Sequence, residues 1–392
     1  MKESLQTNCN LECFPCTYPG QWLYLFKEGG LVYSEVGNRF AGLDAAGVSA
    51  YRAFDAGAQV QDMRFPGNDQ GLTSASSDAL ETIHALSQGD FPGEDVPAAW
   101  PALDPSSCED PATATIEIDG IPVSLHYPSG GSESLCQDYF RNCPPTSRPP
   151  CCCLSAQPEK NAWVIRVNGR EFLTLEREHQ IGLGLMHAAR ALLYAEGDYD
   201  IAFHAAMVAH GNRGIMLCAP RECGKSTLAA YLVAQGFELL ADEPALLHLD
   251  TWSVQALRLP ISLKQGSWSS LREHWPQLAE APVHVRSDGT KICLAHPTDE
   301  HRSTALRRVT QLVFPHYGAS SVPHAESLLP LHTLRLLSDG GMLLAKHFAR
   351  DDFETFLKWV CVTPAYKLEY PSLQEACTLL RQIDRNFARP QI

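Results

Sequence analysis

The sequence lacks the features that would place it among membrane, secreted or nucleic-acid-binding proteins. It has no run of about eighteen apolar residues, the length that a transmembrane helix needs. The opening MKESLQTNCN is polar where a secretory signal would be apolar. Basic residues are scarce, with 31 Lys and Arg against 45 Asp and Glu and a net charge of -14, whereas nucleic acids are bound by clustered cations. We therefore expect a cytoplasmic protein that binds neither membrane nor nucleic acid.

The chain has 14 cysteines, but their spacing is not that of a disulfide framework. They cluster at Cys9, Cys13 and Cys16 and again at 151–153, and three adjacent cysteines form no regular disulfide framework, so we expect free thiols. The C-x3-C-x2-C spacing of CNLECFPC occurs in radical-SAM enzymes, but the turn-rich sequence that follows does not fit that fold. Zinc, with a fourth ligand from Cys143 or the triple cysteine, is one alternative. Surface thiols on a loose tail are the interpretation we favour.

The length and the 45% hydrophobic content allow two or three domains, and no internal repeat is evident. The predicted segments are a Cys-containing tail (1–20), a small module (21–88), a Pro-rich linker (89–112), a β-rich part (113–200) and a core (201–392).

In the small module, QWLYLFKEGGLVYSE predicts two strands joined by a Gly29-Gly30 turn. A helix from about residue 44 to 54 follows, with Asp44 as its N-cap, and a second helix is expected over 76–89.

The β-rich part contains two dipeptides that are typical of β-hairpin turns. Two hairpins are expected, over 113–127 with a turn at Asp119-Gly120 and over 161–176 with a turn at Asn168-Gly169. A short helix and loop separate them, and a longer helix is expected over 179–197. The apolar face of that helix comprises Ile181, Leu185, Ala189 and Leu192.

From residue 201 onward, an apolar run, the turn HGNRG and a second strand lead into CAPRECGKST and a predicted helix over 225–234. This stretch fits the phosphate-binding pattern G-x-x-x-x-G-K-[ST] except that Ala219 replaces the first glycine. In such loops backbone N–H groups surround a phosphate, the lysine reaches its oxygens and the serine binds magnesium. The residues assigned to nucleotide binding are Ala219, Pro220, Arg221, Glu222, Cys223, Gly224, Lys225, Ser226 and Thr227.

Two departures from the pattern need an account. Alanine is excluded at 219 only if the position requires positive φ or very close backbone approach. Glu222 is harder to accommodate, because a carboxylate about 6 Å from a phosphate charge costs roughly 3 kcal/mol at an effective dielectric near 20. We therefore predict that the Glu222 side chain points to solvent.

Acidic residues follow the next predicted strand, where a magnesium ligand or a catalytic base belongs in a phosphate-loop protein. They are Asp242 and Glu243. His204 precedes the loop in the apolar run, where a histidine taken alone is more often a core residue.

The segment FHAAMVAHGNRGIMLCAPRECGKSTLAAYLVAQGFELLADE resembles the catalytic segment of the HPr kinase family. His204, Lys225, Ser226 and Asp242 fall on matching positions, and Glu243 replaces the second Asp of the family's pair. Downstream stretches resemble HPr-kinase-like proteins encoded beside ribosomal-peptide modification genes, so that the likeness covers about residues 113 to 385. These stretches are LPISLKQG with Lys264, DGTKICLAHP with Lys291, LVFPHYGA with His316 and Tyr317, and PAYKLEYPSLQEA with Tyr366.

The resemblance implies an α/β (α+β) fold related to phosphoenolpyruvate carboxykinase, with strands on both sides of the phosphate-loop helix. It implies that Asp242 is the base, that His204 holds and tunes Asp242, and that Lys225 neutralises the transferred phosphoryl group. Ser226 with an acidic residue, Glu243 or Asp242, would hold magnesium. Lys264 and His316 are candidate substrate contacts, with a solvated surface role as the alternative.

The stretch LYLFKEGGLVYSEVGNRFAGLDAAGVSAYRAFDAGAQV resembles the PqqD-type winged-helix domains that recognise leader peptides. Such domains add the peptide as an edge strand. A structural cap on the kinase is the alternative. Together the two resemblances predict a kinase that uses Mg²⁺ and ATP or GTP to phosphorylate Ser or Thr of a precursor peptide, in a possible homo-oligomer. The alternatives are a kinase of a free small molecule such as an amino acid, and an inactive nucleotide-binding protein that recognises a peptide.

Overall fold

The computed structural model describes residues 11–16, 20–35, 38–56, 113–130, 133–220, 222–303, 305–318 and 322–387. These residues form a mixed α/β structure, as expected, with helices and several separate sheets. They cluster into two compact units. In the part of the chain so described, the helices are too short or too polar to cross a membrane.

The first unit combines the described part of Met1–Asp95 with Ser327–Asp339 and Lys346–Ala365. Two segments that the sequence assigned to the core therefore cluster with the N-terminal module. The elements of this unit are β1 (Glu12–Pro15), β2 (Gln21–Phe26), β3 (Gly29–Ser34), β4 (Arg39–Leu43), α1 (Ala45–Asp55), α7 (Pro330–Asp339) and α8 (Arg350–Val362).

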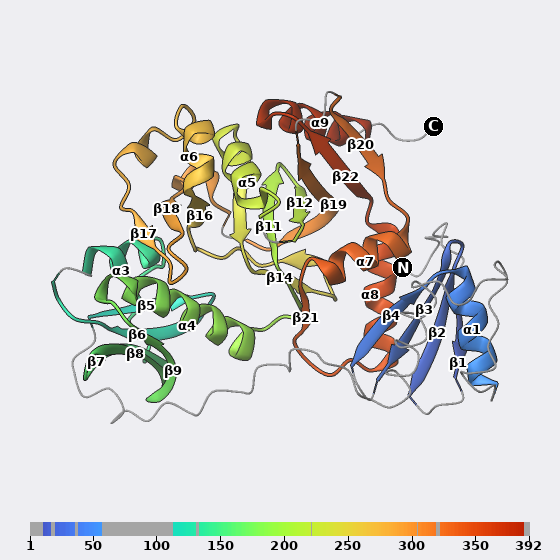
Figure 1. Cartoon of the computed structure of the whole chain (residues 1–392), viewed down its shortest axis with the longest axis horizontal. Helices are drawn as coiled ribbons and strands as arrows, with labels where there is room; N and C mark the ends of the chain where they lie inside the picture. The colour runs from blue at the N-terminus through green and yellow to red at the C-terminus, as the bar shows by residue number, and fades with distance from the viewer. Residues whose placement is uncertain are drawn as a thin grey trace. The chain divides into compact units, whose positions relative to one another are not determined.

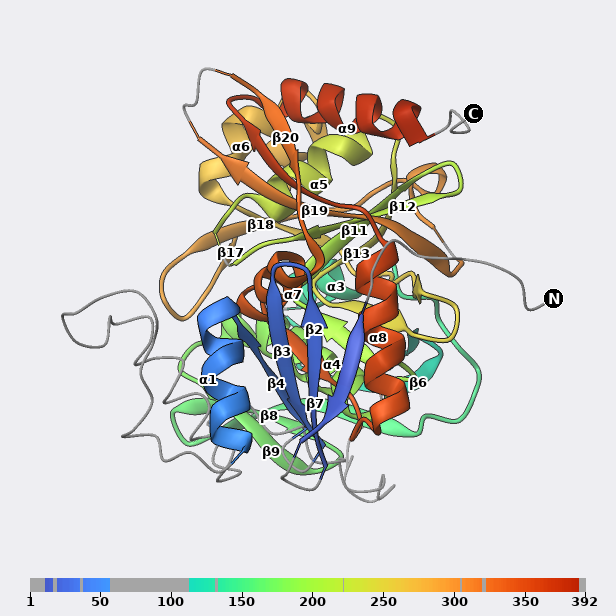
Figure 2. The ribbon, with the colours of Figure 1, turned by 90° about the vertical axis from the view of Figure 1, so that its right-hand side faces the viewer.

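The four strands form one antiparallel sheet in the order β1-β2-β3-β4, which lies between α1 and α8 (Figure 2). Aromatic side chains hold α8 to the sheet: the rings of Tyr33 and Phe353 stack with centroids 3.9 Å apart, and Tyr24 and Phe40 contact Phe353 at 5.7 and 5.5 Å. The Tyr33 hydroxyl donates a 2.6 Å hydrogen bond to the Phe348 carbonyl. The core of the N-terminal sheet is thus completed by residues from near the C-terminus.

The predicted helix of this module is confirmed, since α1 begins after Asp44 and the Gly47 N–H donates to Asp44 Oδ1 at 2.7 Å. The predicted turn was wrong by two residues, because Gly29 and Gly30 belong to β3 and Phe26 pairs with Gly29 across Lys27 and Glu28. A Cβ on Gly30 would lie 2.6 Å from Val48 of α1, so this glycine permits helix packing rather than a turn. The helix expected over 76–89 and the linker lie outside the described residues.

The second unit opens with a five-stranded sheet in the order β5-β6-β7-β8-β9, against which α4 packs. Both predicted hairpins are confirmed, with Asp119 and Asn168 at φ 50° and 49° followed by left-handed glycines, as type I′ turns require. The four residues of the predicted α4 face are all fully buried. The elements are β5 (Ala114–Ile118), β6 (Ile121–His126), α3 (Glu133–Phe140), β7 (Cys152–Glu159), β8 (Ala162–Val167), β9 (Arg170–Leu175), η3 (Glu178–Gln180) and α4 (Ile181–Glu196).

A ten-stranded sheet follows, with the path β13-β11-β12-β19-β15-β14-β10-β21 and with β22 pairing β19 and β20. The apolar run from residue 201 is two strands rather than one, because the chain breaks at His204, whose N–H donates to the Gly341 carbonyl. The strands are β10 (Ile201–Phe203), β11 (Ala205–His210), β12 (Arg213–Cys218), β13 (Glu238–Asp242), β14 (Ala245–His248), β15 (Ser253–Val254), β19 (Arg307–Tyr317), β20 (His324–Ser327), β21 (Met342–Leu344) and β22 (Ala365–Tyr370).

The helix after the predicted phosphate loop, α5 (Lys225–Ala234), packs between this sheet and a three-stranded sheet in the order β16-β18-β17 (Figure 1). Leu228, Ala229, Ala230 and Leu232 are fully buried as a result. The remaining elements are β16 (Ile261–Lys264), α6 (Gln265–Leu271), η4 (Pro276–Ala279), β17 (His284–Val285), β18 (Lys291–Ala295), η5 (Asp299–His301) and α9 (Leu373–Phe387).

The cysteines depart from the sequence prediction at one position. Cys153 is disulfide-bonded, whereas Cys13, Cys16, Cys151 and Cys152 are free. Cys13 accepts a 3.6 Å hydrogen bond from Arg350. Among the described side chains, no group of three or more His, Cys, Asp and Glu residues is arranged to hold a metal ion, and Cys9 lies outside them.

Candidate functional site

The predicted phosphate loop joins β12 to α5, the strand-to-helix setting that its mechanism requires. Gly224 is the N-cap of α5 in the left-handed region, at φ 85° and ψ 12°. In the described part of the loop, positive φ is found at Glu222 and Gly224, whereas Ala219 does not have it. The missing first glycine therefore imposes no backbone strain here. Arg221 lies outside the described residues.

Lys225 folds back over the loop. Its ammonium donates hydrogen bonds to the carbonyls of Ala219 at 2.5 Å and Pro220 at 3.0 Å. Burial lowers the pKa of Lys225, and the nearby charges of Glu243 and Asp242 oppose that effect. The lysine thus lies at the mouth of the loop with carboxylates in its electrostatic range, where it can exchange carbonyl partners for phosphate oxygens.

The Glu222 side chain points outward as predicted, with 77% of it exposed. Its carboxylate lies 2.8 Å from Lys264 Nζ, and this hydrogen bond and charge lower the pKa of Glu222. The ion pair places Lys264 beside the loop. By contrast, His316 lies on the exposed end of β19 and is not among the residues that line the loop cavity. Of the two candidate substrate contacts, the structure brings only Lys264 to this site.

Asp242 ends β13 behind the loop and is only 4% exposed. The Ser226 hydroxyl donates to Asp242 Oδ1 at 2.9 Å, and the Ser262 N–H donates to Oδ2 at 3.1 Å. Burial, with the charge of Glu243, raises the pKa of Asp242 to about 6. Serine hydroxyl and carboxylate are hard oxygen ligands side by side, which is what magnesium at a phosphate loop takes.

The resemblance implied that His204 would contact Asp242, but in the structure His204 contacts Glu243 instead. Its Nδ1 lies 2.8 Å from Glu243 Oε1. Burial acts to raise the pKa of Glu243, but the His204 hydrogen bond and the charges of Arg190, His204 and Lys225 outweigh it and lower that pKa to about 2. The reason for the changed partner is local: the chain turns at Glu243, with φ 56°, so that the two consecutive carboxylates point to different neighbours.

These groups border one cavity of about 530 Å³, a volume in the range of small-molecule sites. Glu243 lines it, with 32% of its side chain exposed, whereas Asp242 is not part of its lining. The side chains come from the loop, from α4 and from the segments around β16 and β17. Besides Glu243 they are Leu183, His187, Arg190, His204, Glu222, Gly224, Lys225, Ser226, Thr227, Ser262, Lys264, Ser267, Arg286, Ser287 and Asp288.

Sequence reasoning missed the side of the cavity opposite the loop. Leu183, His187 and Arg190 recur at helical spacing on α4, next to the apolar face that had been identified. A histidine and an arginine at that spacing in a largely buried helix were the available signal. Arg286 and its neighbours lie in the β17–β18 turn, where nothing in the sequence pointed to a ligand.

A buried cluster supports that turn. Asp138 Oδ2 lies 3.0 Å from His284 Nε2, and Asp138 Oδ1 lies 3.0 Å from His296 Nε2. Asp138 and His284 are 3% and 2% exposed. Burial acts to raise the pKa of Asp138, but the hydrogen bonds from His284 and His296 outweigh it and lower the pKa. Two residues after His284 comes Arg286, so the cluster fixes the base of the segment that lines the cavity.

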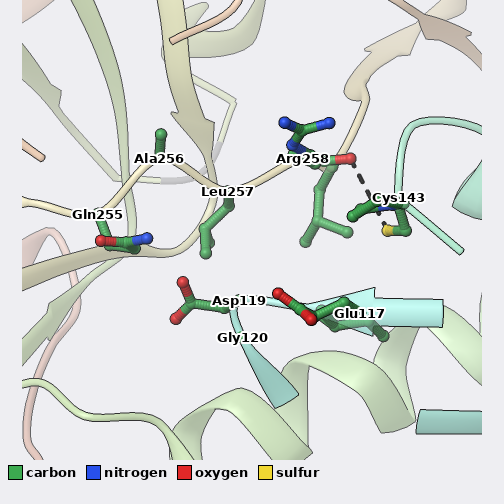
Figure 3. A pocket seen from close by; sticks show the side chains of 11 residues that line it. Glu117, Asp119, Gly120, Cys143, Gln255, Ala256, Leu257 and Arg258 are labelled. Atoms are coloured by element: carbon green, nitrogen blue, oxygen red, sulfur yellow. Dashed lines mark hydrogen bonds between the residues drawn. The ribbon is translucent and has the colours of Figure 1, made fainter. Parts of the chain in front are cut away.

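A second, smaller cavity of about 200 Å³ lies between the β5–β6 turn and the loop 255–259 (Figure 3). Glu117 and Asp119 point into it, but Glu117 pairs with Arg148 at 3.3 Å. Burial raises the pKa of Asp119, which also has a hydrogen bond with Gln255. Because its polar groups have protein partners, we do not assign a ligand to it.

Comparison with known proteins does not assign the chain to a family, so the interpretation of the site depends on the geometry described above. No protein-family model matches the chain, and no curated protein matches it.

Proposed function

We propose that this chain is a phosphotransferase that uses magnesium and a nucleoside triphosphate, ATP or GTP, to phosphorylate a hydroxyl. The observation that carries the proposal is the 2.9 Å contact between Ser226 and Asp242 at the start of a buried helix whose preceding loop ends with left-handed Gly224. This contact supports a magnesium site beside a phosphate loop. The position of α5 between two sheets also favours a fold related to HPr kinase and phosphoenolpyruvate carboxykinase.

In the proposed reaction the loop amides and Lys225 would hold the β- and γ-phosphates, and Ser226 and Asp242 would hold magnesium, which would neutralise phosphate charge. The acceptor hydroxyl oxygen attacks the γ-phosphorus, a new O–P bond forms, and the bond to the β–γ bridging oxygen breaks to release the nucleoside diphosphate. The hydroxyl proton passes to a carboxylate.

We assign that carboxylate to Glu243 in place of Asp242. Glu243 lines the cavity and is oriented by His204, whereas Asp242 is buried behind the loop and already accepts two hydrogen bonds. The lowered pKa of Glu243 keeps it ionised at neutral pH. Because phosphoryl transfer depends mainly on positioning and charge stabilisation, an oriented weak base is sufficient.

The acceptor we propose is a Ser or Thr of a precursor peptide, with the N-terminal unit as a PqqD-like peptide-binding module. A free small molecule such as an amino acid is the second candidate, favoured by the volume of the cavity, which is in the range of small-molecule sites. The features that first favoured an inactive protein, Ala219 and Glu222, count less against activity, since the first has no positive φ and the charge of the second is paired with Lys264.

The test is release of ADP or GDP by the purified protein with magnesium, with and without a peptide encoded beside its gene, together with intact-mass analysis of the peptide. The expected result is a gain of one phosphoryl mass that is lost in K225Q and D242N. Release with a free amino acid but no change in peptide mass would favour the second candidate. Nucleotide binding without turnover of either acceptor would overturn the proposal.

A further inference from the structure

Two arginines line the loop cavity from elements outside the phosphate loop. Arg190 lies on α4 and Arg286 lies in the β17–β18 turn. The Nε atoms of both are buried and have no hydrogen-bond partner among the described residues. A guanidinium is costly to desolvate unless it is paired, and buried donors are nearly always satisfied in a functioning protein.

The nearby carboxylates already have other partners. Glu243 pairs with His204, Asp242 accepts from Ser226 and Ser262, and Asp138 is held by two histidines. In the turn, Asp288 accepts a 2.8 Å hydrogen bond from the Thr290 N–H. The charges of the two arginines act on Asp242, Glu243 and Asp288, but neither Nε has a hydrogen-bond partner among the described residues. These donors can therefore bind an anion from outside the chain.

Tyr139 ties the two arginine-bearing elements together. Its ring lies 4.6 Å from the His284 ring, and a Cβ on Gly182 of α4 would lie 3.0 Å from it. The Tyr139 hydroxyl is buried and also lacks a partner among the described residues. Burial raises the pKa of Tyr139, and the charges of Arg190 and Arg286 oppose it, which indicates that both guanidinium groups lie within electrostatic range of the same ring.

We infer that Arg190 and Arg286 form a second anion subsite in the cavity, which binds a carboxylate of the phosphoryl acceptor while the phosphate loop holds the nucleotide. The inference rests on the proposed phosphotransferase function. The planar guanidinium fork matches a carboxylate in bidentate geometry. The charge of Arg190 also acts on Glu243, so the subsite lies near the group that we assign to the acceptor hydroxyl. An acceptor with a hydroxyl and a carboxylate a few atoms apart would reach both.

Two sources of that carboxylate are possible: the α-carboxylate of a free amino acid, or an acidic side chain beside Ser or Thr in a peptide. Binding to the full-length protein with MgADP can separate them by calorimetry with matched probes. The first pair is O-phospho-L-serine and phosphoethanolamine, which differ by the carboxylate alone. The second pair is a tripeptide Glu-phosphoSer-Glu and its Gln-phosphoSer-Gln counterpart, both with blocked ends.

The expected result is that one carboxylate probe binds about tenfold or more tightly than its neutral counterpart, and that R190Q and R286Q each remove this preference. The affinity for fluorescent methylanthraniloyl-ADP should stay unchanged in both variants and fall in K225Q. R148Q, which removes an exposed arginine outside the cavity, is the matched control and should behave as the wild type.

No preference in either pair would overturn the subsite. So would a loss of nucleotide affinity in R190Q and R286Q as large as in K225Q, since the arginines would then hold the nucleotide's phosphates. These readouts do not need turnover. A carboxylate preference in a protein that transfers no phosphate would therefore refute the proposed function and support the subsite. Phosphoryl transfer without a carboxylate preference would support the proposed function and refute the subsite.

Discussion

The hydroxyl of Ser226 donates a 2.9 Å hydrogen bond to Asp242, a residue that is almost completely buried at the end of β13. The neighbouring Glu243 turns the other way, toward His204. Two consecutive acidic residues thus occupy different environments, with pKa values raised to about 6 and lowered to about 2, respectively. Separated acidities of this kind are typical of sites in which two carboxylates have different tasks.

Magnesium binding should depend on pH through Asp242. Its pKa is raised to about 6 by burial and by the charge of Glu243, so the proton competes with the metal below that pH and not above it. The magnesium concentration needed for half-maximal binding of fluorescent ADP should therefore rise about tenfold for each unit of pH below 6. The check is a magnesium titration from pH 5 to 8. A flat profile in the wild type would contradict the assignment, and D242N should have weak binding at every pH.

Changing Glu243 should separate chemistry from nucleotide binding. E243Q removes the carboxylate that lines the cavity but keeps its size, so kcat should fall by a factor of about 100 or more while the affinity for MgADP changes little. H204Q should lower kcat less, because it removes only the group that orients Glu243. Single-turnover rates and fluorescent ADP binding measure the two effects. Equal losses of nucleotide affinity in E243Q and D242N would show that both carboxylates serve the metal.

The two ends of the proposed phosphate loop should differ in their sensitivity to exchange of glycine and alanine. G224A forces a Cβ into the left-handed region at φ 85°, which costs about 1 kcal/mol of folding free energy and displaces the amides at the start of α5. A219G relieves no strain, because Ala219 does not have positive φ. We expect nucleotide affinity to fall in G224A and to stay within twofold of the wild type in A219G, as measured by calorimetry. A gain of affinity in A219G would show that the alanine does hinder the phosphates.

Removing the buried Asp138 carboxylate should destabilise the second unit. In D138N the amide oxygen can accept from one histidine only, so a ring N–H of His284 or His296 is left without its partner. Breaking such a buried charged contact costs about 3 kcal/mol. Urea unfolding followed by fluorescence measures the loss, with D339N as the control, because Asp339 is in an exposed ion pair with Arg335. An equal, small change in both variants would contradict a structural role for the cluster.

Truncating Phe353 should destabilise the N-terminal unit. The ring stacks on Tyr33 and contacts Tyr24 and Phe40, and it is fully buried. F353A should therefore lower the free energy of unfolding of that unit by about 3 to 5 kcal/mol. Hydrogen exchange at the amides of β2 and β3 reports the change, and F14A, which shortens a ring that is 41% exposed, is the control. Unchanged exchange in F353A would refute the packing of α8 on the sheet.

The sequence predicted the elements whose cause is local. Asp119-Gly120 and Asn168-Gly169 specify their turns through left-handed backbone preference, and Asp44 caps the helix three residues ahead of Gly47. The Gly29-Gly30 turn was wrong because the reason for Gly30 is tertiary, namely the approach of Val48. A glycine alone does not tell a turn from a close contact.

The residues of the candidate site also separate into those set by local sequence and those set by tertiary contacts. The loop and the acidic pair could be predicted from spacing along the chain, since a phosphate loop is a contiguous structure. The partner of His204 could not, because it depends on which way two adjacent carboxylates turn. Asp138 finds its histidines 146 and 158 residues away, and Arg190 reaches the cavity from another layer of the unit. Such contacts leave no periodic signal in one sequence.

The hydrogen bond between Tyr33 and Phe348, just before α8, also has a consequence for folding during synthesis. The Tyr33 hydroxyl bonds the carbonyl of Phe348, 315 residues later. A ribosome takes roughly 15 to 60 s to add that many residues. Strands β2 and β3 must therefore wait, without the aromatic side chains of α8 against Tyr24 and Tyr33, until that helix has been translated. This sheet is therefore synthesised early and completed late, so its apolar face is open to association with other chains during that interval.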